Sequence, residues 1–375
     1  MINTKVCWYV SDYGYGHAAR SIAIIRKWLQ SHPTIQIIVC ASRNPLTFLQ
    51  QSLASFSSSC VQFLEISTEM GYILDPVSLE PNLIQMRERY RQYLHSWRKR
   101  VQMEKQFLRQ QRPLCVVSDI SPIPFLAADE LGIPSVGISN FTWFTAYEDI
   151  LPAHQLDTLR TAYSCMDYFI ALIGAEQEPR WGRMGHANSG FFSREVHPEE
   201  VHRIRQMVDP HRKKTIVFYG MGMSIDHEAV SAHPFWSNEE CIFLVPSHMS
   251  NSRSNVMRIP ASYPESQNYV AAADVVITKP GWSTVSEAYC NSKPMILLRR
   301  KGFREDRSTL DVLEREGRCK GLALSQLSDL RLNFDFVDRL TQEQIQQSSN
   351  SEAGNSLMTV IDHLQQIVTK EVHRV

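Results

Sequence analysis

The sequence of 375 residues predicts an α/β protein with two domains, each built on a doubly wound parallel sheet. The chain is longer than the ~100–200 residues of a typical single domain. Compact apolar runs alternate with helical patterns along both halves, as expected for parallel strands joined by helices. A stretch rich in Gly and Pro, from Pro179 to about Pro198, separates the halves and reads as a linker. We expect domains at residues 1–190 and 191–350, followed by a C-terminal helix within 351–375.

Apolar runs in the first half predict the strands of the first sheet, because strands covered on both faces read as near-continuous apolar segments. The expected strands are residues 5–10 (KVCWYV), 35–40 (IQIIVC), 114–119 (LCVVSD), 134–139 (PSVGIS) and 167–173 (DYFIALI). Helical patterns follow at residues 21–29, 44–53 and 123–132.

The second half repeats this scheme. Its expected strands are residues 213–220 (KKTIVFYG), 241–247 (CIFLVPS), 273–279 (ADVVITK) and 294–300 (PMILLRR), with helical patterns at 284–291 and 309–317. In the C-terminal segment one helical face is apolar, so we expect this helix to pack back onto the body; the face carries Leu357, Val360, Ile361, Leu364 and Val368.

Composition narrows the class of protein. Lys plus Arg and Asp plus Glu both total 39, so there is no positive excess to drive binding to nucleic acid. No run reaches the ~18 apolar residues of a membrane span, and the start lacks the layout of a signal peptide, so we expect a cytoplasmic protein. The eight cysteines are scattered singly, which favours buried free thiols over disulfides or a zinc site.

The first expected strand ends in the loop SDYGYGHAARS, residues 11–21, in which Gly14, Gly16 and Ala19 satisfy G-x-G-x-x-A. A dinucleotide site would also need an acidic residue roughly 20 positions later. The chain has none between Arg20 and Glu65, and the second strand ends near Arg43. Only the 2′-phosphorylated cofactor NADP could use that arginine, so NADP is kept as a lesser alternative.

His17 and Asp119 are the candidate catalytic pair. His17 follows the second glycine of the loop, and a pKa near ~6.5 suits an imidazole for proton transfer. Asp119 ends a buried-looking strand, and the carboxyl ends of parallel strands line the ligand crevice of such sheets. There it could fix the tautomer of His17. The structural alternatives are a histidine that packs the turn and an aspartate that caps the next helix.

The stretch ITKPGWSTVSEAY, residues 277–289, carries the second candidate site. A helix begins there at about Ser283, and the amides of Ser283 and Thr284 could receive a diphosphate. Glu287, one turn further on, could accept the hydroxyls of a ribose. The alternative is a capping box, Ser283 to Ser286 or Thr284 to Glu287, that serves only the helix.

With its flanking strands AAADVVI and KPMILLRR, this stretch resembles the donor-nucleotide signature of GT-B glycosyltransferases. The nearest types are lipid II synthases, monogalactosyldiacylglycerol synthases and the amino-terminal half of plant L-arabinokinases. The loop Gly14-Tyr-Gly16-His17 and the segment LGIPSVGISNFTW fit as well. The resemblance covers about residues 5–325, and it implies two Rossmann-like domains that face a central cleft.

The resemblance also implies roles for individual residues. Glu287 would bind the donor ribose, Glu305 and Asp306 would contact sugar hydroxyls, and Arg307 would lie nearer phosphate. Glu305 and Asp306 have an alternative as a solvated charge cluster at a helix start. The remaining donor-binding candidates are Gly220, Gly222, Ser224, Ile259, Lys279, Gly281, Ser283 and Thr284. The candidates of the acceptor or phosphate loop are Gly14, Gly16, Arg20 and Asn140.

The expected activity is inverting, metal-independent transfer of a sugar from a nucleotide diphosphate, UDP above all, to an acceptor hydroxyl or amine. His17 would be the base, and no cofactor or metal is expected. Three alternatives stay open: a nucleotide-sugar hydrolase, an NADP-dependent oxidoreductase and a non-catalytic nucleotide-sugar sensor. The acceptor could be a small molecule, a lipid or a glycan.

Residues 83–108 form a basic amphipathic pattern. The apolar stripe consists of Leu83, Met86, Tyr90, Leu94, Trp97, Val101 and Leu108, and the basic residues are Arg87, Arg89, Arg91, Arg98, Lys99, Arg100 and Lys105. Such a helix can contact an anionic membrane surface or an acidic acceptor. The alternative is a helix that packs by its stripe and exposes a solvated basic face.

Overall fold

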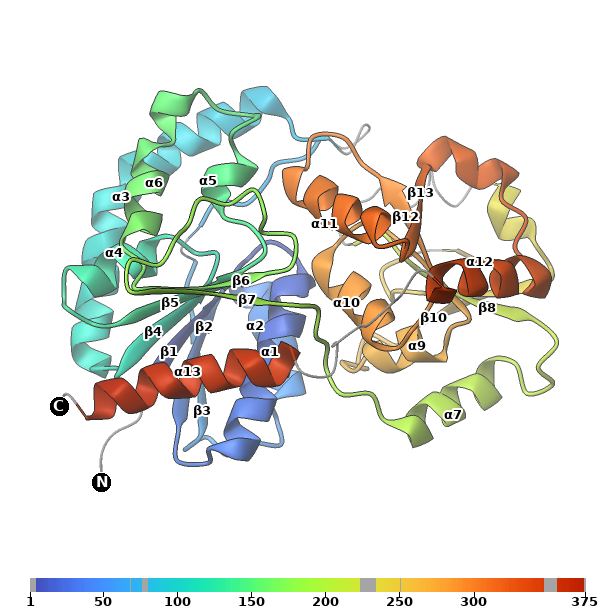
Figure 1. Cartoon of the computed structure of the whole chain (residues 1–375), viewed down its shortest axis with the longest axis horizontal. Coiled ribbons are helices and arrows are strands. Elements are labelled where there is room, and N and C mark those ends of the chain that lie inside the picture. The colour runs from blue at the N-terminus through green and yellow to red at the C-terminus, as the bar shows by residue number, and fades with distance from the viewer. Residues whose placement is uncertain are drawn as a thin grey trace. The chain divides into compact units, whose positions relative to one another are not determined.

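The computed structural model describes residues 5–67, 69–75, 80–222, 234–249, 251–346 and 356–373. The chain divides into two compact units (Figure 1). Unit 1 comprises Met1–Ile73, Pro81–Gly190 and Gly354–Val375, and unit 2 comprises Leu74–Glu80 and Phe191–Ala353. Each unit has one sheet in which every strand pair is parallel, so the prediction of two doubly wound parallel-sheet units is confirmed.

Unit 1 has a seven-stranded sheet in the order β3-β2-β1-β4-β5-β6-β7. Its strands are β1 (Lys5–Val10), β2 (Gln36–Ala41), β3 (Val61–Glu65), β4 (Cys115–Asp119), β5 (Ser135–Ser139), β6 (Tyr168–Leu172) and β7 (Gly185–Ser189). Its helices are α1 (Tyr15–Ser31), α2 (Arg43–Ser52), α3 (Leu83–Gln111), α4 (Ile123–Asp129), α5 (Trp143–Ala146), α6 (Asp157–Ser164) and α13 (Ser356–Val372), with a 3-10 turn at Ala153–Gln155.

Crossover connections between the parallel strands place the helices of unit 1 on both faces of its sheet. Helices α1, α2 and α13 cover one face and α3, α4 and α6 the other (Figure 1). On the α13 side, Trp28 of α1 packs against Trp8 of β1 and donates its indole N–H to Gln365 of α13 at 3.1 Å. The C-terminal helix therefore belongs to the core of unit 1.

Unit 2 has a six-stranded sheet in the order β10-β9-β8-β11-β12-β13. Its strands are β8 (Thr215–Gly220), β9 (Cys241–Val245), β10 (Val256–Arg258), β11 (Val275–Thr278), β12 (Met295–Arg299) and β13 (Cys319–Ala323). Its helices are α7 (Pro198–Val208), α9 (Gln267–Ala272), α10 (Trp282–Cys290), α11 (Arg304–Arg315) and α12 (Phe334–Gln346), with 3-10 turns at Pro234–Ser237 and Leu324–Asp329. Its core includes Trp236, packed between Tyr219 and Phe243.

Two expectations about the chain's organisation differ from the structure. The stretch from Pro179 to Pro198, expected to be a linker, contains β7, an edge strand of the first sheet; the units separate within this stretch, after Gly190. In α3, Leu83 is 46% exposed and so lies outside the buried stripe, whereas Tyr93 and Glu104 lie within it.

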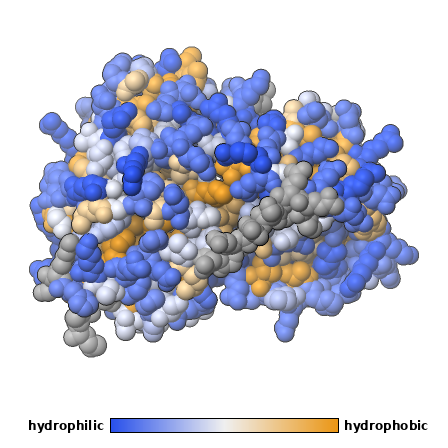
Figure 2. Space-filling model, viewed as in Figure 1, coloured by the Kyte–Doolittle hydropathy of each residue, from blue (hydrophilic) through white to orange (hydrophobic). Residues whose placement is uncertain are grey.

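The cysteines and the surface bear on the remaining expectations. All eight cysteines are free, and four of them, Cys7, Cys40, Cys115 and Cys241, are buried. None of the helices in the described part of the chain combines the length and the apolar character that a membrane crossing requires. On the face drawn in Figure 2, hydrophilic residues predominate and apolar residues form several separate groups.

Candidate functional sites

The first candidate site lies in unit 1, where β1 ends and α1 begins. Gly14 precedes the helix with φ of 79° and ψ of 171°, a conformation that is essentially restricted to glycine. This turn lets α1 start at Tyr15, so that His17 falls in its first turn. The imidazole is buried, with 7% of the residue exposed, and its ring meets the Phe141 ring edge-on at 5.7 Å.

The fold brings Asp119 to His17. Strands β1 and β4 are neighbours, with Val10 opposite Asp119, so both chains leave the sheet at the same carboxyl edge. His17 Nδ1 lies 3.0 Å from Asp119 Oδ1. The N-cap position of α4 is Pro122, so Asp119 does not cap that helix. The two candidate catalytic residues therefore form a buried pair.

Arg20 completes this cluster. It lies one helical turn after His17 and grips both carboxylate oxygens of Asp119, with Nε at 2.7 Å from Oδ2 and Nη2 at 2.5 Å from Oδ1. Nη1 donates to Oδ1 of Asn140 at 2.6 Å, and Nη2 lies 3.1 Å from Oγ of Ser139. Only 3% of Arg20 is exposed. Arg20 thus holds Asp119 directly, and Asn140 accepts a hydrogen bond from Arg20.

Electrostatics and backbone strain both mark this position. Burial by itself raises the pKa of Asp119, but the charge of Arg20, together with the hydrogen bonds from Arg20 and His17, outweighs that effect and holds the pKa below its ordinary value. The next residue, Ile120, has φ of 71°, which is unfavourable for a β-branched side chain. Tyr163 donates its hydroxyl to the Ile120 carbonyl at 2.5 Å. Such strain costs about 1–3 kcal/mol and clusters at functional sites.

Glu69 is a buried carboxyl of unit 1 that the sequence did not single out. It accepts hydrogen bonds from the Asp12 amide at 2.7 Å, from Ser121 Oγ at 3.1 Å and from the indole of Trp143 at 2.9 Å, and Ser11 Oγ also donates to it. Burial, reinforced by the charge of Asp12, raises the pKa of Glu69 to about 7. Glu69 ties together the loops that follow β1, β4 and β5.

The second candidate site lies in unit 2, at the carboxyl ends of β8 and β11. Gly220 ends β8, and Thr278, at the end of β11, donates its hydroxyl to the Gly220 carbonyl at 2.5 Å. A Cβ at Gly222 or at Gly281 would meet Cε of Lys279 at 3.1 Å, so these glycines leave room for the lysine side chain. Burial, helped by the nearby charge of Arg300, lowers the pKa of Lys279 to about 8.

Helix α10 begins beside this lysine. Gly281 is its N-cap and has no side chain to accept an amide, so neither capping box expected from the sequence occupies the helix start. Ser283 is buried and Thr284 half-buried in the first turn. A helix N-terminus next to a cation is an arrangement that favours anions.

Glu287, on the second turn of α10, is paired with Arg194. Arg194 donates from Nε at 3.2 Å and from Nη2 at 2.8 Å to the same oxygen, Oε1. It also binds the Pro264 carbonyl at 2.6 Å and Oγ of Ser266 at 3.0 Å. Both partners are buried, with side chains 2% and 7% exposed. The sequence did not single out Arg194, because nothing local pairs it with a residue 93 positions away.

The remaining donor-site candidates differ in their exposure to solvent. Glu305 and Asp306 are buried in the first turn of α11, so they are not a solvated cluster, and Asp306 accepts from Nε of Arg300 at 2.6 Å. Arg307 is exposed. Ile259 is buried, and its amide donates to the Val245 carbonyl at 2.8 Å. Ser224 lies outside the described residues.

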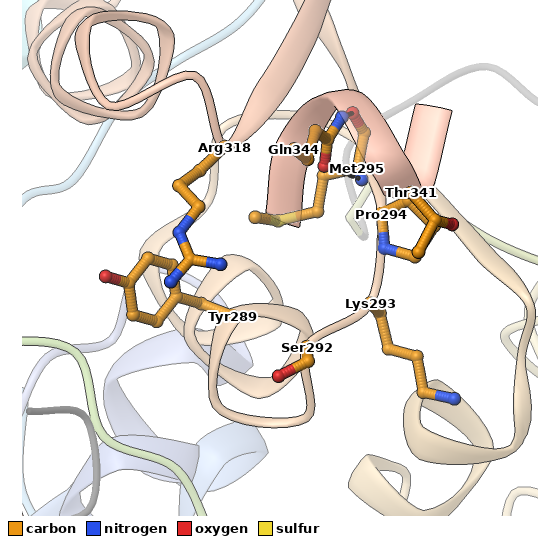
Figure 3. A pocket seen from close by; sticks show the side chains of 8 residues that line it. All are labelled: Tyr289, Ser292, Lys293, Pro294, Met295, Arg318, Thr341 and Gln344. Atoms are coloured by element: carbon orange, nitrogen blue, oxygen red, sulfur yellow. Dashed lines mark hydrogen bonds between the residues drawn. The ribbon is translucent and has the colours of Figure 1, made fainter. Parts of the chain in front are cut away.

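A small pocket in unit 2 lies apart from these residues (Figure 3). It opens where β12 begins, at the amino end of a strand, whereas the candidate residues follow the carboxyl ends. Lys293 and Arg318 are the charged groups that line it, and Arg318 stacks on the Tyr289 ring at 4.8 Å. In the described part of the chain, no group of three or more His, Cys, Asp or Glu side chains is arranged to hold a metal ion.

Two units with doubly wound parallel sheets define the GT-B fold, and comparisons with solved structures agree. Spinosyn forosaminyltransferase SpnP is 13% identical, with a TM-score of 0.62 over 98% of this chain and 99% of its own. Arabidopsis thaliana UGT89C1 complexed with UDP is 12% identical, with a TM-score of 0.63 over 99% of this chain and 100% of its own. MurG of Acinetobacter baumannii is 13% identical, with a TM-score of 0.57 over 97% of this chain and 99% of its own. The predicted resemblance to GT-B glycosyltransferases is thus confirmed for the fold.

A comparison of sequences gives one further relative. L-arabinokinase of Arabidopsis thaliana is 22% identical over 315 residues, which are 82% of this chain. The chain spans only 29% of the length of that plant protein. No family model matches the sequence.

Proposed function

We propose that this protein is an inverting glycosyltransferase that moves a sugar from a UDP-sugar to an acceptor hydroxyl or amine. The observation that carries the proposal is the buried pair of His17 and Asp119, 3.0 Å apart at the carboxyl edge of the first sheet. The structural neighbour UGT89C1 was solved in complex with UDP, which supports UDP as the proposed nucleotide.

In the proposed reaction, His17 removes the proton of the acceptor while the acceptor oxygen or nitrogen attacks the anomeric carbon. The new bond forms on the face opposite to the leaving group, so configuration inverts. The bond from the anomeric carbon to the phosphate oxygen breaks, and its electron pair leaves with UDP. Asp119 orients His17 and stabilises the imidazolium that results. No metal or cofactor enters this scheme.

Unit 2 supplies the proposed donor-binding groups. The amides at the start of α10 and the ammonium of Lys279 would meet the charge that develops on the diphosphate, and such preorganised electrostatics usually make the largest catalytic contribution. The Gly220–Gly222 turn would let the backbone approach the phosphates. Glu287 would accept the ribose hydroxyls, with Oε2 as the principal acceptor because Arg194 holds Oε1.

A thermal-shift screen tests the donor class. UDP should raise the unfolding temperature more than ADP, GDP or NADPH do, and Glu287→Gln should weaken UDP binding about tenfold or more, since charged hydrogen bonds contribute about 1.5–3 kcal/mol. Stabilisation by NADPH alone would instead indicate an oxidoreductase. Thr47→Ala, an exposed position on α2 of unit 1, is the matched control and should leave UDP binding unchanged.

Product analysis tests the reaction. With UDP-sugars and an acceptor library, the enzyme should form glycosides, and His17→Ala should lower the rate by about 10²–10⁴-fold. Rapid release of free sugar without acceptor would show a hydrolase, and binding of UDP without turnover would show a sensor. A wild-type rate in His17→Ala would contradict the assignment of the base.

Contact with an anionic membrane is a further part of the proposal. Ile84 is 82% exposed at the start of α3 and Leu83 is 46% exposed, followed by the exposed residues Arg87, Arg89 and Arg91. Flotation with vesicles that contain anionic lipid should recover the protein, and Ile84→Glu should reduce the recovery. Equal flotation without anionic lipid would contradict the electrostatic part of the contact. Cytoplasmic localisation is likewise proposed, and cell fractionation tests it.

A further inference from the structure

Arg20 contacts His17 directly as well as Asp119. Its Nη2 is 2.8 Å from Nδ1 of His17, while Oδ1 of Asp119 is 3.0 Å from the same nitrogen. A carboxylate and a guanidinium therefore contact one edge of the imidazole together. All three side chains are buried, so water does not screen these charges well.

The hydrogen count favours one tautomer of His17. Nη2 of Arg20 carries two hydrogens, and two oxygens lie within reach of it: Asp119 Oδ1 at 2.5 Å and Ser139 Oγ at 3.1 Å. When both oxygens are served, Nη2 has no hydrogen left for Nδ1. Nδ1 then carries its own proton and donates it to Asp119. In that tautomer the lone pair is on Nε2, at the far side of the ring.

The net charge of the side chains around His17 affects how readily His17 is protonated. In an aspartate–histidine pair alone, protonating the histidine changes the local charge from −1 to 0, and the carboxylate favours the change. With Arg20 present the change is from 0 to +1, so the attraction of Asp119 is offset by repulsion from Arg20. The Phe141 ring packs edge-on against the imidazole, and Arg20 also donates to the uncharged side chains of Ser139 and Asn140.

We propose that Arg20 is a positioning residue that keeps His17 neutral, in its Nδ1–H tautomer, at neutral pH by countering the charge of Asp119. The inference rests on the proposed function in one respect: a neutral His17 is able to take the proton from the hydroxyl or amine of the acceptor substrate. The tautomer and the charge state are properties of unit 1 that can be measured without any substrate.

The direct experiment is an NMR titration of the full-length protein with labelled histidines. The His17 signal is assigned as the one missing from the spectrum of His17→Gln. In Arg20→Met, which keeps the length of the side chain and removes its charge, the pKa of His17 should rise by about one unit or more, a tenfold change in the proton affinity. Lys27→Met, an exposed residue of the same helix, should leave the pKa of His17 unchanged.

A pKa of His17 that stays within about 0.3 unit of wild type in Arg20→Met would overturn the inference. If that variant does not fold, the ¹⁵N shifts of the wild type decide the matter, because an Nε2–H tautomer at neutral pH would overturn it equally. Arg20→Lys keeps the positive charge but not the planar guanidinium group. The pKa of His17 should therefore rise less in Arg20→Lys than in Arg20→Met.

Kinetics separate this inference from the proposed function. If the protein transfers sugar, the acidic limb of the pH–rate profile should move to higher pH in Arg20→Met, and the rate should recover in alkaline buffer. A merely structural role would lower the rate equally at every pH and would overturn the inference. If His17 titrates as expected but no nucleotide sugar is turned over, the proposed function fails while the role of Arg20 stands.

Discussion

The buried pair of Arg194 and Glu287 allows a test of unit 2 that needs no substrate. Arg194→Met removes the cation that faces Glu287 and leaves a carboxylate inside the protein without its counter-ion. The same change removes the donor that now binds the Pro264 carbonyl at 2.6 Å. Breaking one side of a buried ion pair costs about 3–5 kcal/mol, because the remaining charge is neither solvated nor paired.

The double variant Arg194→Met/Glu287→Leu should recover part of that loss. Replacing both partners of a buried pair by apolar side chains of similar volume is often neutral or stabilising. The expected residual cost is about 1–3 kcal/mol, since the Pro264 carbonyl still lacks its donor.

Urea unfolding of the full chain, followed by circular dichroism and tryptophan fluorescence, measures both changes. Arg203→Met serves as the control, because Arg203 pairs with Glu200 on the exposed surface of α7, where an ion pair contributes about 0–1 kcal/mol. The reasoning is refuted if Arg194→Met costs less than about 1 kcal/mol, or if the double variant is no more stable than the single one.

Three further predictions concern pH and backbone geometry. Burial raises the pKa of Glu104 to about 7, so stability should fall by up to roughly 3 kcal/mol between pH 4.5 and 7, and urea unfolding should show this fall largely abolished in Glu104→Gln. Burial lowers the pKa of Lys279 to about 8, so UDP affinity measured by calorimetry should weaken above that pH, and Lys279→Met should remove both the pH dependence and much of the affinity. Gly14→Ala should destabilise the protein by about 1–3 kcal/mol in thermal unfolding, through backbone strain, because beyond the adjacent residues no heavy atom lies within 4 Å of the added Cβ. An unchanged melting temperature for Gly14→Ala would contradict the strained turn.

The sign of the Glu104 effect follows from proton linkage. A carboxyl whose pKa is raised in the folded state binds more protons when folded, so its contribution to stability is complete below the unfolded pKa and is lost as pH rises through the folded value. A stability of the wild type that rises over this range, with no difference from Glu104→Gln, would contradict the assignment.

The strands that the sequence predicted are those buried on both faces, and the ones it missed lie at the edges of the sheets. Strands β3, β7, β10 and β13 are the outermost strands, and all four are partly exposed. An edge strand packs fewer of its side chains, so its residues need not be continuously apolar. For β7, GHANS, the Gly- and Pro-rich surroundings favoured a linker over a strand.

For the first candidate site, the sequence predicted the residues better than their contacts. His17 and Asp119 were identifiable because His17 lies in the loop after one apolar strand and Asp119 ends another, and the ends of adjacent parallel strands meet. Arg20 and Asn140 were predicted beside an acceptor or phosphate; in the structure Arg20 holds Asp119, and Asn140 accepts a hydrogen bond from Arg20. That geometry depends on side-chain conformations and on which loops meet, and neither leaves a pattern in the sequence.

No local sequence pattern identified Arg194 or Glu69 as part of a candidate site. Each gains its meaning from partners far along the chain, Glu287 for Arg194 and the loops after β1, β4 and β5 for Glu69. In α3, the apolar periodicity located the helix but could not show that Glu104 lies in its buried stripe, where Tyr9 donates to it.

The docking of α13 has a consequence for how the chain is made. Unit 1 receives its last helix only after residues 191–353, nearly all of unit 2, have been synthesised. Until then the face of α1 that carries Trp28 lacks its cover and its Gln365 partner. A nascent chain therefore presents an incomplete first unit to the cell while the second is emerging. A fragment cut at residue 190 should expose this face and aggregate, whereas joining residues 356–373 to it through a short linker should restore its solubility.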